Sequence, residues 1–110
     1  MSIKRVANDT DSPIVDTLQD GSGNDIDISG FNKVEIHIQK PDGTSISDDD
    51  SGNVIVQDAS NGEVKYDIQP GDLDQVGYYD YEWEVTFSDG GIETWPSDGT
   101  ASISVRDELA

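Results

Sequence analysis

The sequence predicts an all-β protein, an immunoglobulin-like antiparallel β-sandwich of about seven to nine strands. Three observations predict this fold class. Apolar and polar residues alternate with a period of two, turn-forming residues recur at roughly ten-residue spacing, and a glycine–tyrosine pattern opens the longest apolar stretch. A small β-barrel is the rival fold, because the same pattern of short strands and turns also suits a barrel.

The alternation is clearest in four segments. Every second residue is apolar in the segments 34–38, 64–68, 78–87 and 101–105. In the longest of them, Tyr81 and Trp83 belong to the apolar face and Glu82 belongs to the opposite face. Because successive side chains of a strand point to opposite faces, we expect two antiparallel layers that bury Trp83 and its neighbours between them.

Turn-forming residues separate these segments. Gly, Pro, Asn, Asp and Ser gather at positions 20–24, 41–44, 50–53, 60–62, 69–72 and 88–91. The spacing of Gly77, Tyr79 and Tyr81 is that of a tyrosine corner at the start of a late strand. The match is partial, because Gln75 stands where the pattern has Asp. Tyr81 would occupy the position that antibody domains give to a cysteine.

The length and composition limit the domain organisation. The 110 residues suffice for one domain, and we assign residues 1–12 to an N-terminal arm and residues 13–110 to the sandwich. The chain has no cysteine, which excludes disulfides and thiolate chemistry. It has neither the apolar stretch of a signal peptide nor a run of roughly 18 apolar residues, so we expect no membrane insertion.

The charge is strongly negative. Asp and Glu number 24 against 6 Lys and Arg, which gives a net charge of −18. Such self-repulsion destabilises a compact state, and a Debye length of about 3 Å at 1 M salt removes most of that cost. The sequence therefore indicates adaptation to high salt and a halophilic host. Disorder is the alternative, which the regular alternation disfavours. Acidity also argues against nucleic acid as a partner.

Catalytic and cofactor sites find no support. His37 is the only histidine and a Ser/His/Asp triad would need it, but the alternation places it on the outward face of a strand with Glu35 and Gln39. Glu82 and Glu84 also share an outward face, with no buried pocket to separate their pKa values. No glycine-rich phosphate loop precedes a helix. We predict no catalytic residue, no cofactor and no enzymatic activity.

Calcium is the one metal that the sequence suggests. Asp48, Asp49, Asp50 and Asn53 offer clustered oxygen ligands, as calcium prefers, and residues 20–25 form a second acidic loop. Neither loop fits the EF-hand pattern, and turn chemistry explains both loops without a metal. We therefore assign no metal site and keep the Asp48–Asn53 loop as a weak calcium candidate.

Two residues are candidates for a protein interface. Trp95 precedes Pro96 near a strand end, where it serves either as an exposed aromatic anchor or as a cap on the end of the sandwich. Ile55 is out of phase with Val54 and Val56, which indicates either a second contact or a strand buried on both faces.

Several segments together carry a family resemblance. The two most recognisable are E-W-E-V-T-F-S-D-G at 82–90 and E-T-W-P-S-D-G at 93–99, and the others are 30–38, 41–43, 62–67 and 77–79. In this order and spacing, over roughly residues 14 to 106, they resemble the N-terminal domain of phage baseplate upper proteins, the BppU family. The resemblance implies a β-sandwich that serves as a building block of tailed-virus particles.

The resemblance also shapes the functional expectation. The sequence stops at Ala110 without a coiled linker or second domain, so we expect a standalone copy of the module. Its expected place is the virion, as a capsid decoration, a turret subunit or a tail or baseplate protein. The expected partners are other virion proteins, further copies of this chain, and the host surface. The alternative is a module that binds host-surface glycans or a receptor through its loops.

Overall fold

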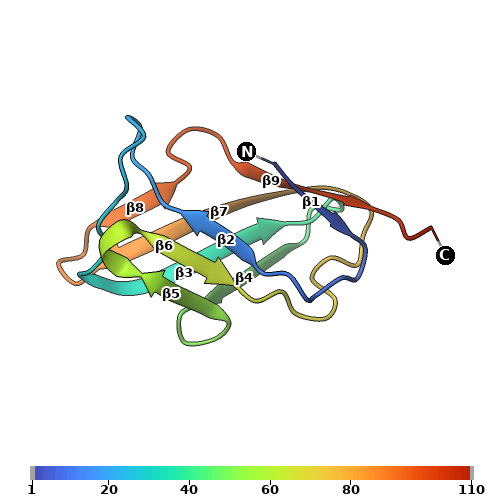
Figure 1. Ribbon diagram of the computed structural model, residues 1–110, viewed down its shortest axis with the longest axis horizontal. Coiled ribbons are helices and arrows are strands. Elements are labelled where there is room, and N and C mark those ends of the chain that lie inside the picture. Colours follow the sequence, from blue (N-terminus) through green and yellow to red (C-terminus); the bar gives the residue numbers. More distant parts are fainter. Residues whose placement is uncertain (1, 110) are drawn as a thin grey trace.

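The structure is a computed structural model that describes residues 2–109, and it confirms an all-β sandwich (Figure 1). Two sheets face each other, and the described residues contain nine strands and one short 3₁₀ turn, Ala59–Asn61. The strands are β1 (Ser2–Val6), β2 (Ile14–Thr17), β3 (Phe31–Gln39), β4 (Ser45–Asp49), β5 (Val54–Asp58), β6 (Glu63–Tyr66), β7 (Gly77–Phe87), β8 (Ile92–Trp95) and β9 (Ala101–Arg106).

The larger sheet is built around β7. Its strand order is β1-β9-β7-β3-β4, and β8 also pairs with β7. The first half of β7 pairs with β9 and the second half pairs with β8, so β8 and β9 lie on the same edge of β7. Residues 96–100 connect them. The smaller sheet has the order β2-β6-β5, and all of its pairings are antiparallel.

The first strand belongs to the larger sheet. Residues 2–6, which the sequence assigns to an N-terminal arm, form β1 and pair in parallel with residues 102–106 of β9. Ile3 packs against the core, and the pairing continues where Ala7 N donates to Arg106 O at 2.9 Å. The β1 strand therefore covers an edge of β9 that would otherwise be open.

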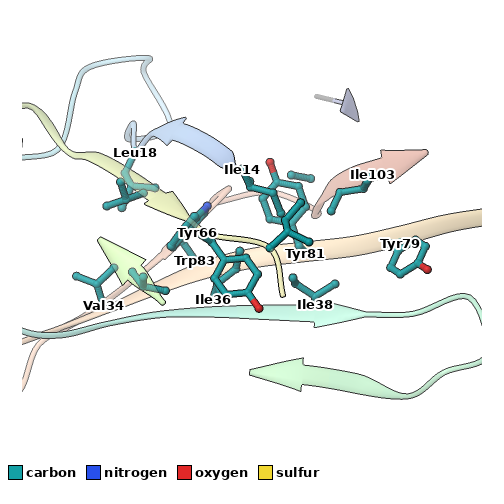
Figure 2. Close-up of a cluster of buried hydrophobic side chains, with 14 of the residues drawn as sticks. Ile14, Leu18, Val34, Ile36, Ile38, Tyr66, Tyr79, Tyr81, Trp83 and Ile103 are labelled. Atoms are coloured by element: carbon teal, nitrogen blue, oxygen red, sulfur yellow. The ribbon is translucent and has the colours of Figure 1, made fainter. Parts of the chain in front are cut away.

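The core lies between the two sheets and follows the predicted alternation (Figure 2). Trp83 and Tyr81 are almost completely buried, as predicted. Their register partners on β3 are Ile36 and Ile38, respectively. From the smaller sheet, the buried side chains include Ile14, Val64 and Tyr66. Because each aromatic ring removes a large apolar area from water, these residues supply much of the hydrophobic stabilisation.

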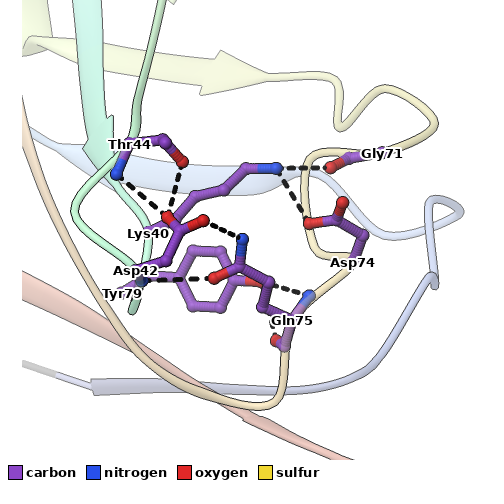
Figure 3. A network of polar contacts seen from close by, with 7 residues as sticks. All are labelled: Lys40, Asp42, Thr44, Gly71, Asp74, Gln75 and Tyr79. Carbon is purple, nitrogen blue, oxygen red and sulfur yellow. Dashed lines mark hydrogen bonds and ion pairs between the residues drawn. The ribbon is translucent and has the colours of Figure 1, made fainter.

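The predicted tyrosine corner is present (Figure 3). The hydroxyl of Tyr79 donates to the carbonyl of Gln75 at 2.7 Å and accepts from the amide of the same residue at 2.9 Å. The ammonium of Lys40 reaches the loop before β7, where it contacts Gly71 O and Asp74 Oδ1, each at 2.8 Å. These contacts fasten that loop to the β3–β4 hairpin.

Candidate contact surfaces and polar sites

A buried carboxylate joins the two sheets. Asp16 on β2 is only 3% exposed, and its Oδ2 accepts hydrogen bonds from Tyr81 Oη and Trp83 Nε1 on β7, each at 2.9 Å. Among the described residues, no donor reaches its other oxygen. Burial raises the pKa of Asp16, and the bonds from Trp83 and Tyr81 act in the opposite direction. We call these three residues the Asp16 clasp.

The sequence did not point to the Asp16 clasp, although it carried one signal. Asp16 lies midway between the buried Ile14 and Leu18, so a period of two places it on the inward face. An acid at such a position is almost always paired when it is buried. The clasp connects Tyr81, the residue at the expected cysteine position, with the opposite sheet. The role is structural.

The outer face of the smaller sheet carries a row of two exposed apolar side chains with a lysine between them. Val15 on β2 and Ile55 on β5 both lie opposite Lys65 on β6, so the three residues form a line across the strands. Val15 is 51% exposed and Ile55 is 41% exposed. The ammonium of Lys65 lies 3.7 Å from a carboxylate oxygen of Asp67. We call this row the small-sheet face, and it includes the interface candidate Ile55.

The second interface candidate is held closer to the core. Trp95 lies on β8 opposite Trp83, is half-buried and packs against the core. The indole thus packs at the margin of the core, and a contact of Trp95 with a partner protein stays a prediction. Nearby, Phe87 and Ile92 help to line an open hollow of about 400 Å³, and Ile92 is 61% exposed.

The calcium candidates are engaged in hydrogen bonds within their own loop and to β3. Asp48 Oδ2 accepts from Asn53 Nδ2 at 2.8 Å, and Asp50 Oδ1 accepts from the amide of Val34 at 2.9 Å. Asp49 Oδ1 accepts from the amide of Ser51 at 2.9 Å, an arrangement typical of Asx turns. These bonds shape the β4–β5 connection, and calcium binding there stays a prediction.

Polar side chains gather on the outer face of the larger sheet. His37 Nε2 lies 3.3 Å from Glu35 Oε1, and Nδ1 lies 3.0 Å from Ser47 Oγ on β4. Glu84 on β7 lies directly opposite Glu35 in the register. Lys33 Nζ lies 3.4 Å from the other oxygen of Glu35. Sequence alternation put His37 and Glu35 on one outward face, but only the strand register brings Glu84 beside them.

The described residues contain no helix that is long and apolar enough to cross a membrane.

Comparisons with known proteins agree with this architecture. The model of the BppU N-terminal domain family matches residues 15–96, which is most of the chain. A search of curated proteins found no match. Among solved structures, CopC from Methylosinus trichosporium OB3b is similar at 17% sequence identity with a TM-score of 0.58, over 100% of this chain and 89% of that one. At this identity the likeness concerns the fold alone. With the family match spanning β2 to β8, the chain belongs to the BppU N-terminal domain family.

Proposed function

We propose that the protein is a non-enzymatic structural component of a tailed-virus particle, positioned in its tail or baseplate. The family membership over residues 15–96 carries this proposal, because baseplate upper proteins are parts of such particles. The rigid two-sheet body suits a building block, since its strands hold surface side chains in fixed positions. Capsid decoration is the second location that the same fold could serve.

The small-sheet face is the contact that we assign to a neighbouring virion protein. Val15 and Ile55, on its two edge strands, are apolar and exposed, and the stem of Lys65 between them extends the apolar area while its ammonium lies near the carboxylate of Asp67. The centres of protein interfaces are depleted in charge, whereas the outer face of the larger sheet carries Glu35, Glu82 and Glu84. The small-sheet face therefore fits an interface better than the larger sheet does.

The occupant of this face is a different virion protein with an apolar centre and a basic rim. Glu63 and Asp67 lie beside the row, and the whole chain has a net charge of −18. A second copy of this chain would bring two acidic rims together, whereas a basic rim complements them. Copies of the chain would then follow the symmetry of that partner in the particle.

Mass spectrometry of purified particles tests the location. We expect the protein to be present at a fixed copy number per particle. Electron cryomicroscopy of the particles should locate it in the tail or baseplate. Absence from purified particles, with abundant protein in the infected cell, would overturn the proposal. Density for this protein on the capsid surface would instead identify it as a capsid decoration protein.

A matched pair of variants tests the face. Ile55→Glu replaces an apolar side chain of the small-sheet face with a charged one, whereas Val76→Glu changes another exposed apolar residue, in the loop before β7. We expect Ile55→Glu to remain folded but to lose incorporation into particles, and Val76→Glu to be incorporated normally. Equal incorporation of both variants would show that the partner binds elsewhere.

We also propose that the particle matures in concentrated salt, and the charge of −18 supports this. Binding of host glycans is the weaker alternative. Sugar-binding surfaces commonly need an open aromatic platform, and the candidate Trp95 packs against the core.

A further inference from the structure

The geometry points to a site for a divalent transition-metal ion on the outer face of the larger sheet, formed by Glu35, His37 and Glu84. These residues lie on β3 and β7, and the calcium candidate Asp49 lies opposite Glu35 across β3 and β4. One potential ligand atom from each residue lies within 4.8 Å of those from the other two. The site takes an ion that binds imidazole and carboxylate together.

One of the distances between ligand atoms matches that of a tetrahedral centre. Metal–ligand bonds of about 2.0–2.2 Å place two ligand atoms roughly 3.3–3.6 Å apart. His37 Nε2 and Glu35 Oε1 already lie 3.3 Å apart, which matches this spacing. Glu84 has the flexible side chain that can close the remaining distance, and its backbone is fixed opposite Glu35 by the β3–β7 register.

A neighbouring strand orients the imidazole. Ser47 is the register partner of His37 across β3 and β4, and its Oγ lies 3.0 Å from Nδ1. When Nδ1 carries the ring proton and donates it to Ser47, Nε2 keeps its lone pair and faces the carboxylates. Metal-binding histidines commonly use their second nitrogen in this way, which fixes the tautomer and the ring plane.

The electrostatics favour a cation at this point. Like charges directly opposite on neighbouring strands destabilise a sheet, and Glu35 and Glu84 are such a pair. Lys33 offsets part of this repulsion at 3.4 Å from Glu35, but its side chain is half exposed and can move into solvent. A divalent ion between the carboxylates would remove the repulsion more completely.

The ligand types select the class of ion. One imidazole and two carboxylates, without thiolate, suit Zn²⁺, Co²⁺, Ni²⁺ or Cu²⁺, whereas calcium prefers oxygen ligands alone. Three protein ligands leave a fourth position open, which water or an outside ligand fills. The ion would cross-link β3 to β7 and add stability by binding the folded state only.

Titration with Zn²⁺ at the salt concentration that keeps the protein folded tests the site. We expect one equivalent to bind by calorimetry, and Co²⁺ to give the visible absorption of a tetrahedral centre. His37→Ala should abolish this binding, Glu84→Gln should weaken it markedly, and Ser47→Ala should weaken it by roughly tenfold. Asp80→Asn, on the same outward face of β7 but outside the cluster, should leave it unchanged.

The wild-type chain gives a second readout that needs no variant. Because His37 is the only histidine, a single set of imidazole resonances reports on the site by NMR. We expect those resonances to shift on adding Zn²⁺ and to broaden with Co²⁺. Unchanged resonances, several weak equivalents in the calorimeter, or identical binding by His37→Ala and wild type would each overturn the proposal.

Discussion

The carboxylate of Asp16 lies 2.9 Å from the indole nitrogen of Trp83, in the interior of the sandwich, and connects β2 with β7 across the core. Tyr81 donates to the same oxygen at the same distance. In a chain without cysteine, this polar contact stands where antibody domains have a covalent link between the sheets. The cost of burying the carboxylate is offset by two donors that would themselves lack partners without it.

Removing the Asp16 carboxylate should destabilise the fold strongly. Asp16→Ala leaves the hydroxyl of Tyr81 and the indole N–H of Trp83 buried without an acceptor, and we expect a loss of about 2–4 kcal/mol in the free energy of unfolding. Denaturant unfolding at constant high salt measures it. The exposed Asp80→Asn is the control and should change stability by less than about 0.5 kcal/mol. An Asp16→Ala protein as stable as wild type would show that the clasp contributes nothing.

The pH dependence should carry the signature of Asp16. Burial raises the pKa of Asp16 in the folded state above the ordinary Asp pKa of about 3.9. The contribution of Asp16 to stability is therefore fully present at a pH below the ordinary pKa, and it is lost as the pH rises through the raised pKa. We therefore expect the melting temperature of wild type to rise relative to that of Asp16→Asn as pH is lowered from 8 toward 4. A difference between the two proteins that is constant over this range would contradict the assignment.

The surface aspartates should act in the opposite direction. Hydrogen bonds from Ser29, Thr44 and Ser51 lower the pKa of their turn-capping aspartates, Asp27, Asp42 and Asp49 respectively. Each of these aspartates stabilises the fold at a pH above the ordinary Asp pKa, and this contribution is lost as the pH falls through the lowered pKa. Below about pH 4, wild type should therefore lose stability again. The variant Asp42→Asn, measured by thermal unfolding, should lose less than wild type over this acid range.

Stability should rise with salt concentration. With a net charge of −18, screening of the repulsion should raise the melting temperature by about 10 °C or more between 0.1 and 2 M NaCl. Circular dichroism measures the transition. The double variant Asp80→Asn/Glu82→Gln removes two charges from one sheet face and should depend less on salt. A melting temperature that does not change with NaCl would contradict adaptation to brine.

The backbone at Gly77 should not accept a side chain. Its φ is +136°, and an added Cβ would lie 3.1 Å from Pro41 Cγ in the β3–β4 turn. Gly77→Ala should therefore cost about 1–3 kcal/mol in the free energy of unfolding, by the same denaturant measurement. Gly30→Ala is the matched control, because its Cβ would meet no atom within 4 Å. Equal stability of the two variants would contradict the strain.

The sequence predicted the parts of the fold that alternation and local turns determine. Trp83 and Tyr81 face inward and Tyr79 forms the corner, because these features depend on strand period and on contacts four residues apart. The β4 strand was not predicted, since its residues Ser45–Asp49 are mostly polar and give no apolar period. The pairing of β1 with β9 was also not predicted, because parallel pairing of the two ends of a chain leaves no local signal.

The polar sites depend on longer-range placement. Glu84 meets His37 only through the register of β3 and β7, which no pattern within either strand specifies. Asp16 meets Trp83 only when one sheet is laid on the other, and the two residues are 67 positions apart. The alternation predicts whether each of these side chains faces inward or outward, but it does not predict which residues they contact.

The parallel pairing of β1 with β9 also determines how the molecule responds to pulling. Ser2 lies beside Ser102, and Val6 lies beside Arg106, so a force drawing the start of β1 and the end of β9 apart slides one strand along the other. All hydrogen bonds between the two strands then carry the tension together. In a hairpin pulled from its open end, the bonds would instead break one after another. The mechanical strength of the domain along this axis thus follows from its first and last strands.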